Sequence, residues 1–113
     1  MPRRISFAKT ISQIKNQTKT ETRRLGWNFV RVGDILNAVN KTMGFKKGEK
    51  PIIYKQIRVT ETWREPLNAI TQDGVNAEGF PDMSPDEFVK FFCEFNKVRE
   101  DISVRVIRFS YVK

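Results

Sequence analysis

Few residue types in this chain could carry out chemistry. Its 113 residues include no histidine and a single cysteine, Cys93. Without histidine there is no Ser-His-Asp or Cys-His nucleophile and no histidine-ligated zinc. One cysteine also excludes a zinc finger held by four thiolates. We therefore expect no metal and no cofactor, and any reaction has to use Lys, Asp, Glu, Ser, Thr or Tyr side chains.

The hexapeptide from Lys19 to Arg24 alternates threonine with charged residues. This alternation predicts a strand with an exposed polar face. Arg23 and Arg24 are candidates for phosphate contacts, because the guanidinium fork matches the geometry of a phosphate. In the alternative interpretation, Thr20 and Thr22 are ordinary strand residues and Lys19 faces solvent.

The net charge of +8 is unevenly distributed along the chain. Residues 1–64 carry a net charge of +11, and residues 65–113 carry −3. A basic half joined to a mildly acidic half predicts a face that attracts nucleic acid, although a basic face can also be merely solvated. Lys46 and Lys47, in a segment rich in glycine and lysine, could extend an anion-binding track. Trp27 follows a glycine in a predicted loop and is a candidate for stacking on a base.

A length of 113 residues predicts one domain, residues 1–113. No run of about 18 apolar residues is present, so we expect no membrane span. The basic N-terminus lacks the apolar stretch of a signal peptide, and a lone cysteine cannot form an internal disulfide. We expect a cytoplasmic protein that is a monomer, with a weak dimer as the alternative.

Segments rich in β-branched and aromatic residues, bounded by turn residues, predict five strands. They cover residues 4–8, 19–24, 35–39, 52–62 and 103–112. In the last of these, Val104 and Val106 fall on one face, whereas Ile107, Phe109 and Tyr111 fall on the other. Either a bulge near 106–107 or burial on both faces would explain this switch.

Three helical segments accompany the strands. A short helix is expected over 10–17, with Thr10 as a candidate cap, and one or two helical turns over 65–77, with Pro66 near their start. Ser84-Pro85-Asp86-Glu87 has the pattern of a capping box, which predicts a helix start. Behind it lies a stripe at helical spacing that we expect to be core: Phe88, Phe91, Phe92 and Phe95.

This order of elements predicts an α+β protein. A mainly antiparallel sheet, closed as a small barrel and plugged by the phenylalanine-rich helix, accounts for the pattern. The absence of strand–helix–strand alternation argues against a parallel, doubly wound sheet.

The sequence resembles bacterial and phage ASCH domains, which belong to the PUA-like superfamily. Lys19-Thr20-Glu21-Thr22-Arg23-Arg24 is similar to the Lys-Thr-x-Thr-Arg-Arg signature of that family. Gly33-Asp34-Ile35, Ile57-Arg58-Val59-Thr60 and Ala77-Glu78-Gly79-Phe80 follow in the family's order, and the match covers roughly residues 5–112. One departure is Asn16-Gln17-Thr18, which stands where many relatives have a glycine before the lysine.

The resemblance implies a small PUA-like mixed or antiparallel β-barrel with a cleft between the Lys-Thr segment and the Glu-Gly segment. Some compact members are similar to amidohydrolases that deacetylate N4-acetylcytidine, and others are thought to bind or cleave RNA. Carried over to this chain, the catalytic set implied is Lys19, Thr22 and Glu78, with Arg24 binding substrate. A plainer interpretation of Glu78-Gly79 is a helix that ends at a C-terminal glycine.

The implied set can work without a metal. A threonine hydroxyl needs a base, and a lysine that is desolvated and crowded by Arg23 and Arg24 can have its pKa lowered enough to serve. A partly buried glutamate can then pass the proton to the leaving amine. On an extended strand Lys19 and Thr22 would face opposite sides, so Lys19 has to lie in the turn before the strand, or a bulge has to intervene.

Three functional hypotheses follow. The first is a nucleic-acid-binding module, for RNA rather than DNA, with a cleft for one splayed-out nucleotide. The second is a metal-free amidohydrolase acting on a modified cytidine nucleoside, with a ribonuclease as a related alternative. The third is a small interaction domain whose basic face binds an acidic protein.

Overall fold

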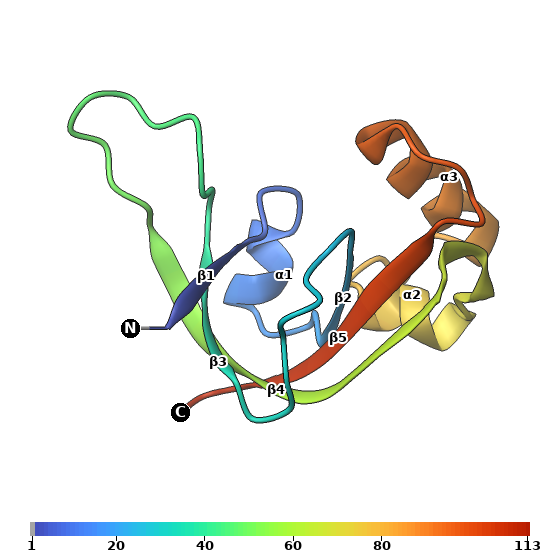
Figure 1. Ribbon diagram of the computed structural model, residues 1–113, viewed down its shortest axis with the longest axis horizontal. Coiled ribbons are helices and arrows are strands. Elements are labelled where there is room, and N and C mark those ends of the chain that lie inside the picture. The colour runs from blue at the N-terminus through green and yellow to red at the C-terminus, as the bar shows by residue number, and fades with distance from the viewer. Residues whose placement is uncertain (1) are drawn as a thin grey trace.

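A computed structural model describes residues 2–113 (Figure 1). The elements along the chain are β1 (Arg3–Ser6), α1 (Ile11–Lys15), β2 (Glu21–Arg24), β3 (Ile35–Val39), β4 (Ile53–Pro66), the 3-10 turn η1 (Leu67–Ala69), α2 (Gln72–Ala77), α3 (Pro85–Asn96) and β5 (Ser103–Tyr111). All five strands belong to one sheet in the order β1-β3-β4-β5-β2. The β1–β3 pair is parallel, and the other pairs are antiparallel.

The sheet curls into a half-barrel around its longest strand, β4 (Figure 1). The register of β4 against β5 shifts between Val59 and Glu61, so that Thr60 is an extra residue on β4. Such a bulge bends a strand and increases its twist. The α+β class, the mixed sheet and the presence of the helices are as predicted. The expectation that the phenylalanine-rich helix plugs the barrel was wrong, because α1 lies inside the curl with Ile14 buried there, whereas α3 packs in a separate apolar cluster. Closure is partial, because β1 and β2 are the two edges of the sheet and no backbone ladder joins them in the described residues.

The two ends of β5 bury opposite faces, which explains its switch in pattern. Val104 and Val106 pack with η1, α2 and α3 in one apolar cluster. Ile107 and Phe109 pack inside the curl with residues of β1, α1, β3 and β4. Both faces of β5 are therefore buried, and the irregularity in register lies on the partner strand, at Thr60, rather than at 106–107.

Helix α3 begins with the predicted capping box. The backbone N–H of Glu87 donates to Ser84 Oγ at 3.1 Å, and the backbone N–H of Ser84 donates to Glu87 Oε1 at 3.0 Å. Behind this cap Phe88 and Phe92 of the phenylalanine stripe are buried in the apolar cluster that also contains Val104 and Val106. The expectation that the whole stripe is core was wrong for Phe95, which is 57% exposed because the core ends before the last turn of the helix.

Two other expectations need correction. The strand predicted over 19–24 begins only at Glu21, and its first three side chains are buried instead of exposed. Glu21 pairs with Arg108 of β5, and Arg23 pairs with Glu65 of β4. Thr10 precedes α1 as expected, but its side chain makes no capping hydrogen bond. None of the helices formed by residues 2–113 is long and apolar enough to cross a membrane.

Candidate functional site

The turn between α1 and β2 places Lys19. The backbone N–H groups of Thr18 and Lys19 both donate to the carbonyl of Gln13, at 3.0 and 3.3 Å. Gln17 adopts a left-handed φ of 62° in this turn. Lys19 therefore lies before β2 begins, so the alternation of side chains along the strand does not turn it away from Thr22.

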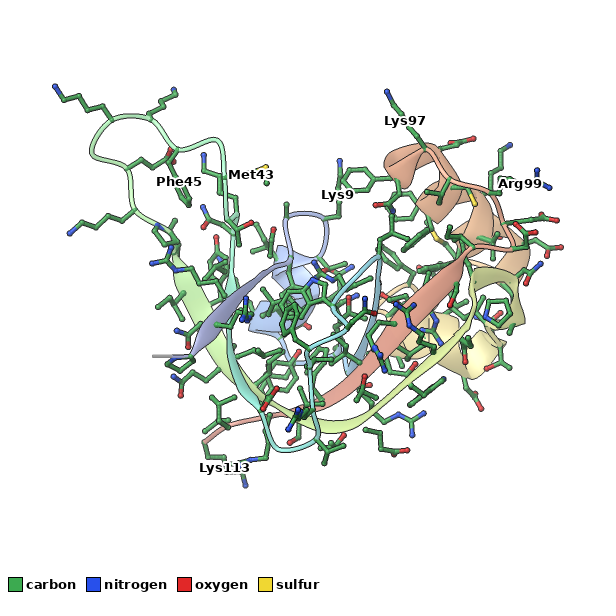
Figure 2. The ribbon with its side chains drawn as sticks, in the orientation of Figure 1. Lys9, Met43, Phe45, Lys97, Arg99 and Lys113 are labelled. Atoms are coloured by element: carbon green, nitrogen blue, oxygen red, sulfur yellow. The ribbon has the colours of Figure 1, made fainter. Side chains whose placement is uncertain are left out.

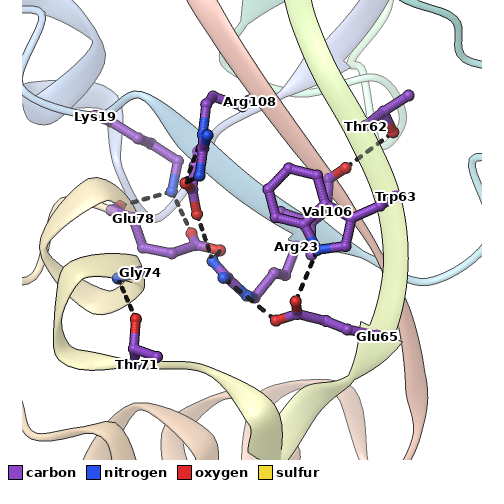
Figure 3. A network of polar contacts seen from close by, with 11 residues as sticks. Lys19, Arg23, Thr62, Trp63, Glu65, Thr71, Gly74, Glu78, Val106 and Arg108 are labelled. Atoms are coloured by element: carbon purple, nitrogen blue, oxygen red, sulfur yellow. Dashed lines mark hydrogen bonds and ion pairs between the residues drawn. The ribbon is translucent and has the colours of Figure 1, made fainter.

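Lys19 meets Glu78 at the end of α2 (Figure 3). Its Nζ donates to Glu78 Oε1 at 2.6 Å and to the carbonyl of Glu78 at 2.7 Å. The two residues are only 2% and 4% exposed. Burial lowers the pKa of Lys19, the nearby Glu78 carboxylate opposes this shift, and the positive charges of Arg24 and Arg23 add to it.

Arg23 extends the buried ion pair into a network (Figure 3). Its Nη1 lies 3.2 Å from Glu21 Oε1 and 3.5 Å from Glu78 Oε2, and its Nη2 lies 3.5 Å from Glu65 Oε2. Gly74 makes room for it, since a Cβ at that position would come within 2.9 Å of Arg23 Nη2. With carboxylates facing both terminal nitrogens, the geometry favours orientation of Glu78 by Arg23 over contact with phosphate.

Sequence reasoning missed the carboxylates that complete this network. Glu21 and Glu65 approach Arg23, and Arg108 on the neighbouring strand β5 pairs with Glu21 and Glu61 at 2.8 Å each. The only sequence signal for them was the alternation of charge along the strands. Among residues 2–113 no group of three or more His, Cys, Asp or Glu side chains could hold a metal ion.

Arg24 bridges the two edges of the half-barrel. Its Nε donates to Thr22 Oγ1 at 3.0 Å on β2, and its Nη2 donates to the carbonyl of Ser6 at the end of β1. The guanidinium also lies 4.8 Å from the ring centroid of Phe7. Burial lowers the pKa of Arg24 to about 10, with Glu78 opposing the shift, so this residue is still cationic at neutral pH.

A pocket of about 190 Å³ opens at this gap between the sheet edges, next to α3. The polar groups that line it include Lys19, Thr22 and Glu78. Aromatic rings from α3 and from two loops make up much of the rest. The lining aromatic residues are Phe7, Phe80, Phe88, Phe91, Phe92 and Phe95. The site thus combines an ammonium, a carboxylate and a hydroxyl with flat apolar surfaces, an arrangement that suits a planar ligand with polar edges.

Lys19 also faces the rings of this pocket. Its Nζ lies 5.8 Å from the centroid of Phe7 and 5.9 Å from that of Phe80. Phe80 packs against Phe91 of α3 with their centroids 5.6 Å apart. Two aromatic rings of the pocket therefore lie close to the buried ammonium of Lys19.

The structure places the other candidate residues away from the pocket lining. Thr20 is exposed, and its backbone pairs with Ala77 and Phe109. Trp27 is half-buried and packs against the apolar cluster inside the curl instead of standing free in its loop. Lys46 and Lys47 are exposed on the loop between β3 and β4, which projects from the sheet (Figure 1).

Comparison with known proteins gives matches among solved structures alone. A search of protein-family models finds no match, and no curated protein matches either. The crystal structure of an ASCH domain from Lactobacillus crispatus JV V101 has a TM-score of 0.67 and 17% identity, and the match covers 96% of this chain and 78% of that one.

Two further crystal structures are similar over nearly the whole chain. Protein EF3133 of Enterococcus faecalis V583, from family DUF984, has a TM-score of 0.67 and 18% identity, over 99% of this chain and 77% of that one. Hypothetical protein PH0355 has a TM-score of 0.68 and 18% identity, over 99% and 100%. The predicted resemblance to ASCH domains is therefore confirmed at the level of the fold.

Proposed function

We propose that this domain binds single-stranded RNA and takes one unstacked nucleobase, standard or modified, into the pocket between β1, β2 and α3. The observation that carries this proposal is the combination of aromatic walls with the polar trio of Lys19, Thr22 and Glu78. Proteins that recognise single-stranded RNA stack splayed bases on aromatic side chains and bind base edges with polar groups. The pocket volume of about 190 Å³ is smaller than that of pockets for drug-sized ligands, which favours a single base over a longer ligand.

The charge of the domain supports a polyanionic ligand. The net charge is +8, and Lys9 and Arg24 are among the residues that line the pocket. Cationic side chains at a pocket for a base can contact the phosphates on either side of it. RNA is favoured over DNA because sequence-specific RNA recognition targets unstacked bases of this kind.

The binding proposal is tested by titrating a fluorescent single-stranded RNA at two salt concentrations. Phosphate contacts release counterions, so we expect the affinity to fall at least about tenfold between about 50 and 200 mM salt. An affinity that does not change with salt would contradict binding through the phosphates. Electrophoresis of the same RNA after incubation shows whether the chain cleaves it.

The role of the pocket is tested with two threonines. Thr22→Val removes a hydroxyl that lines the pocket while keeping the shape of the side chain, and we expect weaker nucleoside binding. Thr62→Val is the matched control, because Thr62 Oγ1 bonds to the carbonyl of Val106 at 2.8 Å and does not line the pocket. Equal loss of affinity in the two variants would contradict the assignment of the pocket.

A second candidate function is hydrolysis of an acetylated base, such as N4-acetylcytidine. The buried pair of Lys19 and Glu78 beside Thr22 favours it, since a buried ion pair is costly to desolvate and perturbed lysines gather at functional sites. The lowered pKa of Lys19 increases its neutral fraction, which is the form that accepts a proton.

The reaction would proceed in two balanced steps. Thr22 Oγ attacks the acetyl carbon while Lys19 takes the hydroxyl proton, and Glu78, at 2.6 Å from Lys19, relays a proton to the amine nitrogen as the C–N bond breaks. Water then hydrolyses the acetyl ester of Thr22. It releases acetate and restores the hydroxyl.

The hydrolytic candidate is tested by incubation with N4-acetylcytidine and chromatography of the products. Cytidine should accumulate with the native chain, and Lys19→Met or Glu78→Gln should abolish its release. Mass spectrometry of a rapidly quenched sample should show acetyl on the peptide that contains Thr22. Unchanged turnover in both variants would show that neither Lys19 nor Glu78 takes part in the reaction.

A further inference from the structure

Phe95, in the last turn of α3, has an exposed aromatic ring that lines the pocket. Phe95 is 57% exposed, whereas Phe88 and Phe92 of the same stripe are 3% and 6% exposed. The rings of Phe91 and Phe95 are nearly parallel, with an interplanar angle of 18° and centroids 6.5 Å apart. Both rings line the pocket. The stripe therefore continues past the protein core, and its last ring is turned to solvent beside the pocket.

A lysine from the opposite side of the pocket lies over this ring. Lys9 is exposed in the turn between β1 and α1, and its Nζ is 5.0 Å from the ring centroid of Phe95. Figure 2 shows Lys9 pointing outward, toward the same side of the molecule as the C-terminal end of α3, where Lys97 is labelled. A cation and an exposed aromatic face thus meet at one position along the edge of the pocket.

We infer that Phe95 and Lys9 form a subsite for a second nucleotide of a single-stranded RNA. The base next to the one in the pocket stacks on the Phe95 ring, and the Lys9 ammonium contacts the phosphate that joins the two nucleotides. This inference rests on the proposed binding function and narrows its ligand to an oligonucleotide, in preference to a free nucleoside.

The chemistry of the two side chains supports this assignment. A ring that is exposed beside a pocket for a base offers a stacking surface to the adjoining base, whatever its identity. The long, flexible stem of lysine allows its ammonium to leave the ring for a phosphate. A charged hydrogen bond to a phosphate is stronger than the exposed cation–π contact that it replaces. The protein as a whole is cationic, which favours the additional phosphate.

The chain contains a matched control for this pair. Phe29 is 49% exposed, and the guanidinium carbon of Arg3 lies 4.1 Å from its ring centroid. Neither residue lines the pocket. Phe29→Ala and Arg3→Ala therefore remove an exposed ring and its cation elsewhere on the surface.

The test compares the binding of a nucleoside and of its trinucleotide by calorimetry. We expect Phe95→Ala to weaken trinucleotide binding roughly five- to 150-fold, the range found for loss of one stacked base. Because Phe95 also lines the pocket, nucleoside binding can weaken as well, but by at least about fivefold less than trinucleotide binding. Phe95→Trp should restore trinucleotide binding, and Phe29→Ala should bind as the native chain does. Thermal unfolding confirms that each variant is folded.

Lys9→Ala provides a second, independent readout. Loss of one phosphate contact should reduce the log–log salt slope of trinucleotide binding by about 0.7, and Arg3→Ala should leave that slope unchanged. If the native chain and Phe95→Ala bind the trinucleotide equally well, the inferred subsite is contradicted, whereas the proposed pocket for one base is not. If the native chain binds neither ligand, the proposed function itself fails, and the subsite fails with it.

Discussion

Lys19 Nζ lies 2.6 Å from Glu78 Oε1, although 59 positions separate the two residues in the chain. This contact joins the turn before β2 to the end of α2 beneath a pocket of aromatic rings. Both residues are almost fully buried. Removing two charges from water opposes folding, so a gain in stability is a weak explanation for this buried ion pair. A role in the pocket explains it better.

The pair can be tested through the stability of its variants. Glu78→Gln leaves the buried Lys19 without its carboxylate, and we expect the free energy of unfolding to fall by about 3 kcal/mol. The double variant Lys19→Met, Glu78→Gln removes the unpaired charge and should recover most of this loss. Urea denaturation measures the free energy of unfolding of both variants.

An exposed ion pair serves as the control for this cycle. Arg99 and Asp101 lie 3.6 Å apart with side chains 89% and 66% exposed, so Asp101→Asn should change stability by less than about 0.5 kcal/mol. If the double variant loses as much stability as Lys19→Met and Glu78→Gln lose in sum, the two residues are not coupled.

The left-handed residue before Lys19 predicts a stabilising substitution. Gln17 is exposed and has a φ of 62°, a conformation that costs residues other than glycine about 1–2 kcal/mol. Gln17→Gly removes that cost but gives the unfolded chain more freedom, so we expect a net gain of about 0.5 kcal/mol. In contrast, Lys15→Gly within α1 should destabilise the protein, because glycine is a poor helix residue. Thermal unfolding distinguishes the two, and a loss of stability in Gln17→Gly would contradict the assigned turn.

The bridge between the sheet edges predicts a loss of affinity. Arg24→Lys keeps the charge but cannot donate to both Thr22 Oγ1 and the carbonyl of Ser6. We expect nucleoside affinity to fall, because the two sheet edges that border the pocket are then no longer joined through this side chain. Arg108→Lys is the control, since Arg108 also lies over an aromatic ring, that of Trp63, but outside the pocket lining. Calorimetry should show the nucleoside affinity of Arg108→Lys unchanged. Equal losses of affinity in the two variants would contradict a specific role of Arg24 at the pocket.

The tyrosine that holds the Lys19 turn predicts a pH effect. Tyr111 O–H donates to the carbonyl of Lys19 at 2.5 Å, and burial raises the pKa of Tyr111 from its ordinary 10.0 to about 12. Between these two values the folded chain holds a proton that the unfolded chain has released. This residue's contribution to stability is therefore complete below pH 10 and is lost as the pH rises through about 12.

Ultraviolet titration of the phenol absorbance measures this pKa directly. The native chain has two tyrosines, and Tyr111→Phe should remove a transition near pH 12. If the transition that disappears lies near 10, the pKa of Tyr111 is not raised, which would contradict its half-buried position.

The regular parts of the fold were predictable because their patterns are local. The strand over Ile35–Val39 follows the turn residues Gly33 and Asp34, and the capping box at Ser84 fixes the start of α3. Helical spacing also identified the phenylalanine stripe. What spacing cannot give is where the core ends, and so the exposure of Phe95 was missed.

The site was harder to predict because its partners are distant in the chain. Alternation of charge in β2 is typical of an exposed strand, and nothing local shows that Arg23 meets Glu65 and Glu78. The contact between Lys19 and Glu78 was expected from the resemblance to a family. The spacing of residues alone does not predict that a turn contacts the end of a helix so far away in the sequence. Trp27, chosen for its place in a loop, packs on the apolar cluster inside the curl, a long-range contact that no local pattern indicates.

The central claim is that a base of single-stranded RNA enters the pocket above Lys19 and Glu78, and amide NMR tests it most directly. A short RNA is titrated into the isotope-labelled domain while each backbone amide is followed. We predict saturable shifts at Lys19, Thr22 and Glu78. Shifts confined to the projecting loop with Lys46 and Lys47, and none at the pocket, would contradict the account.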